Sequence, residues 1–409
     1  MQSQTCLNSA ERAGLRPKGN VPTLRFPEYS DKWLECELQD IADLSKGAGI
    51  SKDQLSETGE SCILYGELYT KYKSEVISNV VSKTNIESTN LVRSKANDVI
   101  IPSSGETAID ISTARCVPYD NILLGGDLNI IRLKDQDGRF FSYQLNGVRK
   151  LDIAQIAQGV SVVHLYGESL KRLKVRYPSK SEQEKISSLL SVLDERIETQ
   201  NRIINEIQSL ISGITQKISK HSSIRMTMLS ELLEERNEKN TALFPVHSVS
   251  VSEGVINQID YLGRSFAAAD TSHYNVAHKG DIIYTKSPTG EFPFGIVKRN
   301  AIESNVAVSP LYGVYKPISD DVAIYLHYYF CSPLNAQNYL HKLIQKGAKN
   351  TINITNQRFV QNCIPLPDKK TLEGFVKLTT TVSTKLKLEK SLLEKLQKQK
   401  RYLLTQMFV

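Results

Sequence analysis

The sequence lacks the short motifs by which most nucleotide-using and metal-dependent enzymes are recognised. No glycine is followed by lysine, so there is no Walker A loop, and no Gly-x-Gly-x-x-Gly fingerprint occurs. No glutamate has a lysine two positions later, and no Asn/Asp/Ser-Pro-Pro-aromatic run of the amino-methyltransferases is present. The seven histidines show no His-Glu-x-x-His or Cys/His metal spacing. We therefore predict neither catalytic residues nor metal ligands in this chain.

Long apolar runs and paired cysteines are also missing. No segment approaches about 18 consecutive apolar residues, so we expect no membrane span. Residues 1–20 lack the apolar core of a secretory signal and are expected to form a flexible leader. The six cysteines show no Cys-x-x-Cys spacing, which favours reduced thiols. These features together predict a cytoplasmic protein.

The net charge is concentrated at one end of the chain. Residues 369–409 hold ten Lys or Arg against three Glu, a net charge of +7, and the whole chain also carries +7. Residues 1–368 are therefore neutral overall. A solvated helix face would explain this basic segment, and so would a docking surface for an acidic partner or for DNA backbone.

Two heptad repeats are the strongest pattern that is present. Apolar residues alternate at steps of four and three over residues 186–218, and adding 189 to each position gives a second, matching series. Sustained patterning of this kind predicts two coiled-coil helices. We expect them to run antiparallel, because a whole domain separates them. The predicted seam consists of Ile186, Leu190, Leu193, Ile197, Ile204, Ile207, Ile211 and Ile214, with Phe375, Val382, Leu386, Leu393, Leu396 and Leu403 in the second helix.

The segments before the two helices also repeat. Lys-Ala-Asn-Asp-Val-Ile at 95–100 resembles Lys-Gly-Asp-Ile-Ile at 279–283, and a Ser-containing turn follows each. This predicts an internal duplication and an α+β fold, in which two mixed α/β domains are separated by two long antiparallel coiled-coil helices. The expected boundaries are a leader at 1–20, a first domain at 21–178, a helix at 179–220, a second domain at 221–367 and a helix at 368–409.

Some local elements can be predicted as well. Residues 33–44, 140–158 and 226–238 are expected to be helical, as are residues 321–343 with an interruption at Pro333. Ser181 and Glu184 have the spacing of a capping box, and Asp368 is placed to cap the last helix.

Several loops carry residue types that suit nucleic acid. Residues 65–73 interleave aromatics with lysines, which suits phosphate contact and stacking. Residues 345–351 are basic and carry amides, which can read base edges, and residues 158–161 hold the matching place in the first half. Ordinary surface turns would explain these residues equally well. The candidate DNA contacts are Tyr69, Lys71, Tyr72, Lys73, Ser103, Ser104 and Gln158 in the first half, and Lys286, Ser287, Thr289, Lys346, Lys349 and Asn350 in the second.

Three segments carry a family resemblance: residues 21–33 (Val-Pro-Thr-Leu-Arg-Phe-Pro-Glu-Tyr-Ser-Asp-Lys-Trp), residues 65–72, and Pro178 followed by Glu-Gln-Glu-Lys-Ile at 182–186. With the two-fold arrangement, they resemble the specificity subunit of type I restriction–modification systems. The second half departs from the pattern, because Thr-Leu-Glu stands at 371–373 where Glu-Gln is usual.

The resemblance implies a non-catalytic DNA reader without a cofactor of its own. Each domain would be a target recognition domain that reads one half of a bipartite, asymmetric site in double-stranded DNA. The helices would set the spacing and dock two methyltransferase subunits, which bring S-adenosylmethionine, while restriction subunits bring ATP, Mg and DNA cleavage. The alternatives are a methyltransferase or nuclease with an unfamiliar site, and a coiled-coil adaptor that joins two binding domains.

Overall fold

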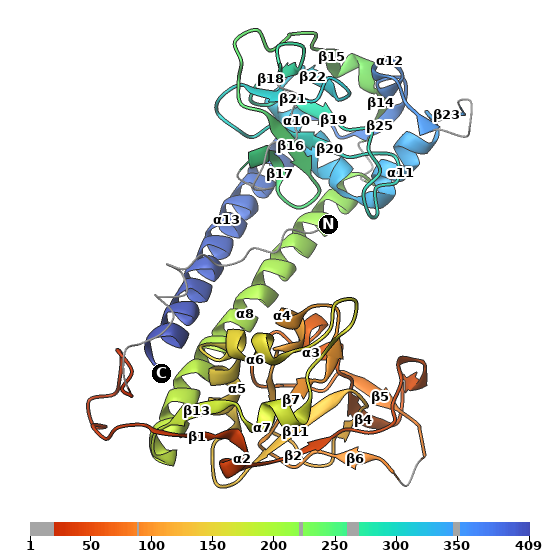
Figure 1. Ribbon diagram of the computed structural model, residues 1–409. Coiled ribbons are helices and arrows are strands. Elements are labelled where there is room, and N and C mark those ends of the chain that lie inside the picture. Colours follow the sequence, from red (N-terminus) through yellow and green to blue (C-terminus); the bar gives the residue numbers. More distant parts are fainter. Residues whose placement is uncertain (1–19, 88–89, 221–223, 260–269, 347–351) are drawn as a thin grey trace. The chain divides into compact units, whose positions relative to one another are not determined.

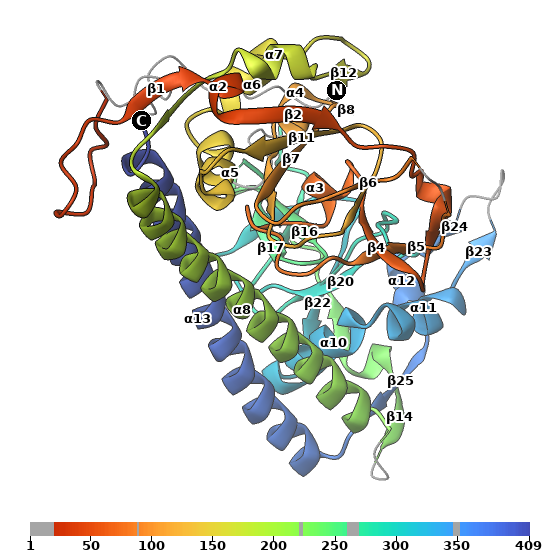
Figure 2. The ribbon, with the colours of Figure 1, turned by 90° about the horizontal axis from the view of Figure 1, so that it is seen from below.

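The computed structural model describes residues 20–87, 90–220, 224–259, 270–346 and 352–409. The chain divides into two compact units. Unit 1 comprises Met1–Asn201 with Leu392–Val409, and unit 2 comprises Arg202–Ser391. Each unit therefore contains one part of each of two long helices, α8 and α13 (Figure 1, Figure 2).

Unit 1 is built on a four-stranded antiparallel sheet in the order β2-β11-β7-β9. Every residue of the inner strand β7 is buried, as expected for a β-branched run covered on both faces. Its strands are β2 (Ala42–Lys46), β7 (Asp98–Pro102), β9 (Arg115–Val117) and β11 (Leu128–Leu133). A second sheet, in the order β3-β5-β4-β10-β6, consists of β3 (Leu55–Ser56), β4 (Glu60–Ile63), β5 (Ser82–Thr84), β6 (Val92–Arg93) and β10 (Leu123–Leu124).

Short helices and two strand pairs complete unit 1. The pairs are β1 (Leu34–Glu37) with β13 (Lys174–Tyr177), and β8 (Ser104–Gly105) with β12 (Val163–His164). The helices are α2 (Leu38–Ile41), η1 (Lys52–Gln54), α3 (Glu67–Thr70), α4 (Ala108–Ile111), α5 (Gly138–Asn146), α6 (Lys150–Ile156) and α7 (Gly167–Lys171). Helix α5 contributes Phe140 to an aromatic core with Trp33 and Phe408, at ring-centroid distances of 5.6 and 5.1 Å from Phe140.

Unit 2 repeats the first sheet. The strands lie in the order β15-β22-β19-β20. When the four strands of each sheet are numbered along the chain, both sheets have the spatial order 1-4-2-3. The strands of this sheet are β15 (Leu233–Glu235), β19 (Ile282–Tyr284), β20 (Val297–Arg299) and β22 (Gly313–Pro317). Unit 2 also contains the strand pairs β14 (Arg225–Met228) with β25 (Cys363–Leu366), β16 (His247–Ser250) with β17 (Gly254–Asn257), β18 (Asn275–Ala277) with β21 (Val306–Val308), and β23 (Gln345–Lys346) with β24 (Ile352–Asn353). The short helices are η2 (Leu229–Glu231), α10 (Asp320–Cys331), α11 (Pro333–His341) and α12 (Asn356–Phe359).

The turn before β7 in the unit 1 sheet is closed by an aspartate. Asp98 accepts the backbone N–H of Lys95 at 2.8 Å and binds the Arg132 guanidinium through both carboxylate oxygens, at 2.8 and 2.7 Å. Asn97 has a φ of 80°, a left-handed conformation that asparagine tolerates better than most residues.

The equivalent turn in unit 2 has the same construction. Asp281 accepts the backbone N–H of His278 at 2.8 Å and binds Arg236 through both oxygens, at 2.7 and 3.1 Å. Gly280 takes the left-handed position with a φ of 91°. The faint echo in the sequence therefore corresponds to one repeated piece of backbone geometry, and the predicted α+β fold with its duplication is confirmed.

Helices α8 (Lys180–Ile218) and α13 (Lys369–Gln406) run antiparallel within each unit. In unit 1, Ile186 and Leu190 share a core with Met407 and Phe408. In unit 2, the other part of α8 meets the start of α13, since Ile214 packs on the core that contains Phe375. The seam residues predicted from the heptads are all buried or half-buried.

A charged residue, Lys400, stands at a seam position near the end of α13. Lys400 lies where the heptad predicts an apolar residue, and its ammonium contacts the carboxylates of Glu75 and Asp194, at 2.5 Å from Asp194 Oδ1. Tyr143 donates its hydroxyl to the other oxygen of Asp194 at 2.7 Å. Burial lowers the pKa of Lys400, but the two carboxylates outweigh this and raise it. At this position the apolar contact is therefore replaced by a buried ion cluster that holds α13 on unit 1.

Two predicted helices are wrong. Residues 33–44 form β1, a single helical turn and β2, and residues 226–238 include β14, η2 and β15. The reason is long-range pairing, because β1 pairs with β13 and β14 pairs with β25. The predicted helix at 140–158 is two helices, since Gly147 ends α5 by donating to Tyr143 O at 2.9 Å.

Two further local predictions have different outcomes. Helix α8 begins at Lys180, so Ser181 lies inside its first turn and is not the N-cap that the sequence predicted. Asp368 does cap α13, because it accepts the Thr371 backbone N–H at 3.0 Å. Helices α10 and α11 meet at Pro333 as expected. None of the helices in the described part of the chain is long and apolar enough to cross a membrane.

Candidate nucleic-acid interface

Three segments that are distant in sequence meet beside α3 of unit 1. A Cβ added to Gly105 of β8 would lie 3.9 Å from the hydroxyl of Tyr69. Strand β8 pairs in turn with β12, where Ser104 faces His164. Gln158 exchanges both backbone hydrogen bonds with His164, at 2.9 and 2.7 Å, and closes an exposed hairpin. The fold thus brings together Tyr69, the turn after β7 and the hairpin at 158–164.

Tyr69 keeps its proton at this surface. Burial raises the pKa of its phenol, and the nearby Tyr65, Asp110 and Glu106 raise it further. The hydroxyl therefore stays neutral near pH 7 and can donate a hydrogen bond to a phosphate or to a base acceptor. The exposed amide of Gln158 adds a donor and an acceptor to the same surface.

Lys71 is fixed by a buried carboxylate. Its ammonium donates to Glu67 Oε1 at 2.6 Å and to Ser82 Oγ at 2.9 Å. The other oxygen of Glu67 accepts the Leu64 backbone N–H at 3.0 Å. The lysine thus neutralises Glu67, while its side chain remains 47% exposed and can still approach a phosphate. Lys73 is exposed.

Three predicted contacts do not lie on this surface. Tyr72 is 7% exposed and belongs to the core, where it packs in one cluster with Leu68 and Ile77. Burial raises the pKa of Tyr72 to about 12. Ser103 and Ser104 are buried, and their backbones are engaged at the β8–β12 pair. These three residues position the surface and are not free to touch DNA.

In unit 2, the turn after β19 occupies the corresponding place. The backbone groups of Thr289 and Phe292 bond to each other at 3.1 and 2.9 Å, which leaves Ser287 and Thr289 exposed. Lys286 is half-buried, and this burial lowers its pKa despite the opposing charge of Glu235.

The second predicted segment of unit 2 is a hairpin after α11. Gln345 of β23 pairs with Asn353 of β24, and Lys346 pairs with Ile352. It stands between α11 and α12, as the hairpin at 158–164 stands between α6 and α7. Lys349 and Asn350 lie outside the described residues.

Residues 30–209 match the family model described as type I restriction modification DNA specificity domain. This stretch of the chain is a type I restriction–modification DNA specificity domain. The family resemblance drawn from the sequence is thereby confirmed. The chain is also similar to the crystal structure of a type I restriction–modification S subunit from M. genitalium, with a TM-score of 0.61 and 16% identity over 95% of this chain and 99% of that chain.

A second solved chain, from work on complex assembly and conformational transition of the type I R-M system, matches with a TM-score of 0.51 and 11% identity. The match covers 91% of this chain and 96% of that chain. At these identities the two structures establish a shared fold, and both fold likenesses extend over the two units and the long helices.

The structure explains the sequence motifs of the specificity domain. Arg25 binds both carboxylate oxygens of Glu182, at 2.8 and 2.7 Å, and Lys185 lies 4.7 Å from the centre of the Phe26 ring. The segment at 21–33 is therefore clamped to the start of α8, through Glu182 and Lys185 of the Glu-Gln-Glu-Lys run. In the second half Thr371 takes the place of Glu182, so this clamp is not repeated there.

A cavity of about 560 Å³ lies beside the surface around Tyr69 and contains a residue that the sequence did not single out. Lys52, from η1, lines it together with Tyr65, Thr70 and Lys71. No aromatic–basic alternation marks residues 47–54, so only the fold reveals that Lys52 adjoins α3.

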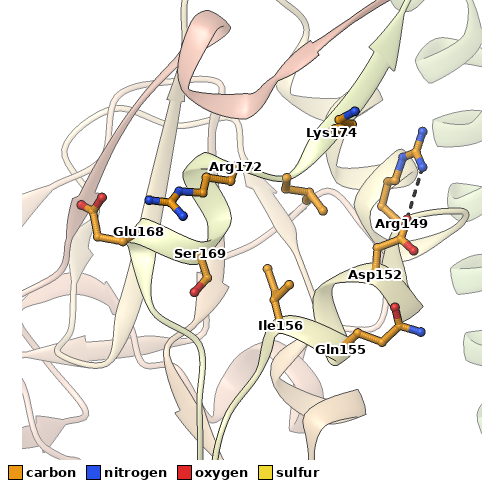
Figure 3. A pocket seen from close by; sticks show the side chains of 9 residues that line it. Arg149, Asp152, Gln155, Ile156, Glu168, Ser169, Arg172 and Lys174 are labelled. Carbon is orange, nitrogen blue, oxygen red and sulfur yellow. Dashed lines mark hydrogen bonds and ion pairs between the residues drawn. The ribbon is translucent and has the colours of Figure 1, made fainter.

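A larger cavity, of about 610 Å³, lies between α6, α7 and β13 (Figure 3). Arg149 is engaged in it, because its guanidinium donates to Asp152 at 3.2 Å and to the main-chain oxygen of Val409 at 3.0 Å. The remaining charged lining residues are Glu168, Arg172 and Lys174. The lining offers no histidine or cysteine, and the described residues contain no cluster of His, Cys, Asp and Glu able to hold a metal ion.

Proposed function

We propose that this chain is the DNA-reading subunit of a type I restriction–modification complex, with each unit reading one half of a bipartite, asymmetric site in double-stranded DNA. The observation that carries the proposal is the repetition of one frame with different loops. Both units share the strand order and the aspartate-closed turn. The turns and hairpins at the corresponding edge differ in sequence, so they would read different bases.

The contacts in the first half would come from Tyr69, Gln158, Lys71 and Lys73, with Lys52 as an addition. In the second half they would come from the turn that contains Lys286, Ser287 and Thr289 and from the hairpin with Lys346, Lys349 and Asn350. Lysines would neutralise phosphates, and amides and hydroxyls would contact base edges.

The same proposal assigns the helices to assembly. Regions 21–178 and 221–367 would be the two target recognition domains, and α8 with α13 would dock two methyltransferase subunits and set the spacer between the half-sites. Those partners would bring S-adenosylmethionine, and restriction subunits would bring ATP and Mg. The complex would act in the cytoplasm, where the chromosomal DNA lies.

A reciprocal pair of variants tests the reading of half-sites. Y69A/Q158A should relax base preference in one half-site, and S287A/T289A should do so in the other, each by about 1–3 kcal/mol per lost base contact. Methylation by the assembled complex on a randomised target library would measure both. Loss of preference in both half-sites from one variant would contradict the assignment.

The spacer is tested by helix length. Seven residues inserted after Asn201 and seven after Ser391 preserve both heptad registers and add about 10 Å, or about 3 base pairs, to the unread spacer. An insertion in α8 alone should disrupt the pairing and abolish specific methylation. An unchanged spacer in the doubly extended chain would disprove a spacing role for the helices.

A further inference from the structure

Unit 2 contains a buried lysine whose ammonium faces a thiol. Lys298 of β20 is 5% exposed, and its Nζ lies 3.2 Å from Sγ of Cys331, the last residue of α10. A buried ammonium needs an anionic partner, because the loss of hydration is otherwise uncompensated. The Cys331 sulfur lies where the negative charge of such a partner would neutralise the Lys298 ammonium.

The other charged groups around this pair are engaged elsewhere. Arg299, next to Lys298, binds Asp320, and Glu253 on the cavity wall lies 3.8 Å from Lys390 of α13. These acids therefore have cationic partners of their own. The arrangement leaves Cys331 as the anion that matches Lys298.

His327 strengthens the same assignment. Its Nδ1 accepts the backbone N–H of Arg299 at 3.2 Å, so the neutral ring carries its proton on Nε2. That Nε2 lies 3.9 Å from Cys331 Sγ, one helical turn away. The sulfur is thus faced by an ammonium and by an imidazole N–H, and both favour the thiolate.

The sulfur also borders open space. A cavity of about 510 Å³ is lined by Cys331, His327 and Lys298, by Gln208 of α8 and by Leu386 of α13. This opening admits a small reagent to a thiol that is otherwise partly buried.

We infer that Cys331 is a reactive thiolate and a site of covalent oxidation by hydrogen peroxide. The sulfur attacks one peroxide oxygen, the S–O bond forms as the O–O bond breaks, and hydroxide leaves and takes up a proton from solvent. Cys331 becomes a sulfenic acid, oxidised by two electrons, and the peroxide is reduced to water. The neutral product leaves Lys298 without its counter-charge beside the cavity wall formed by α8 and α13.

Electrostatics agree with this geometry. Burial alone would raise the pKa of the Cys331 thiol, but His327 and Lys298 outweigh it and lower the pKa to about 6. Burial raises the pKa of Cys62 to about 11 and that of Cys116 to about 12. Cys331 is therefore mostly ionised near pH 7, whereas those two thiols are not.

The first test is the alkylation of the full chain by iodoacetamide across pH, with each cysteine followed by peptide mass spectrometry. We expect the rate at Cys331 to rise with a midpoint near its pKa of about 6. A midpoint at the ordinary thiol value of about 8.5 would overturn the thiolate assignment. This measurement needs no variant and does not depend on DNA binding.

Variants then identify the cause. K298M should slow alkylation of Cys331 near pH 7 about tenfold, since the loss of thiolate is partly offset by the greater nucleophilicity of a thiol of higher pKa. K316M, at an exposed lysine on β22 of the same sheet, should leave the rate unchanged. Equal rates in both variants would show that Lys298 does not hold the thiolate.

Oxidation is tested by treating the wild-type chain with hydrogen peroxide in the presence of dimedone. The adduct should form at Cys331 before it forms at Cys36, whose thiol pKa burial raises. C331S should lose this adduct. Rapid alkylation without any dimedone adduct at Cys331 would overturn the oxidation step.

Discussion

Replacing Lys400 by methionine removes the ammonium that contacts both carboxylates in the buried cluster of Glu75, Asp194 and Tyr143. The lysine side chain is 14% exposed, and the two carboxylates are 10% and 9% exposed. Removing one partner of a buried ion pair typically costs about 3–5 kcal/mol, because the remaining charge is left without compensation. We expect K400M to destabilise unit 1 by an amount in this range.

The chain contains a built-in probe for this measurement. Trp33 is the single tryptophan, and its ring lies 6.4 Å from that of Phe408, which follows α13. A urea titration followed by Trp33 fluorescence therefore reports the unfolding of unit 1 and the release of the end of α13. Lys398 is exposed two residues away, so K398M serves as the matched control and should change stability by less than about 0.5 kcal/mol.

The penalty in K400M should depend on pH. Burial and then Glu75 raise the pKa of Asp194 above its ordinary value of 3.8, while Lys400 opposes that rise. Without Lys400 the pKa rises further, so the folded state binds a proton more tightly than the unfolded chain does. Protonation on acidification therefore stabilises folded K400M, and its deficit should be largest near about pH 8 and smaller near about pH 5.

Two outcomes would refute this reasoning. The first is an equal shift of the urea midpoint in K400M and K398M, which would mean that the buried position of the ammonium contributes nothing. The second is a K400M deficit that stays constant or grows on acidification, which would mean that uncompensated carboxylates are not its cause. The pair D194N and K400M/D194N completes a double-mutant cycle for the direct contact.

Three further variants test other parts of the molecule. I204D/I207D places two charges in a buried part of the seam and should cost several kcal/mol, with loss of co-purifying methyltransferase; normal assembly would contradict a docking role for the helices. G213A should raise the stability of unit 2 by about 0.5–1 kcal/mol, since a Cβ there meets nothing within 4 Å, and a lower urea midpoint would be the contrary result. R25A leaves Glu182 buried and unpaired, so Trp33 fluorescence should report a loss of about 3 kcal/mol or more, whereas an unchanged midpoint would show that the clamp is dispensable.

Long, local patterns made parts of this fold predictable. The heptads of α8 and α13 repeat over more than thirty residues in each helix, so a single exception such as Lys400 does not obscure them. The cap at Asp368 and the break at Pro333 depend on neighbours within a few residues. Each of these signals is contained in one continuous stretch of sequence.

The errors occur where distant partners decide the structure. Strand β1 has four residues and is extended because it pairs with β13, so the helix predicted at residues 33–44 does not form. Tyr69 and Tyr72 look alike in sequence, but only the position of the core decides that Tyr72 packs inward. Lys52 and the surface around Tyr69 adjoin only after folding, and no local motif could have linked them.

The duplication separates the repeated parts of the molecule from those that differ. Both units repeat the aspartate-closed turn, because its Asp must satisfy a backbone N–H and an arginine while a neighbouring residue adopts a positive φ. These constraints come from the backbone and do not depend on any ligand. The turn after β7 or β19 and the hairpin before α7 or α12 carry no such constraint. Their sequences differ between the two units, with Gln158 in the first hairpin and Lys346 in the second. A frame that is held by its own hydrogen bonds can accept new loops without refolding, and that property is what a subunit with two independent reading surfaces requires.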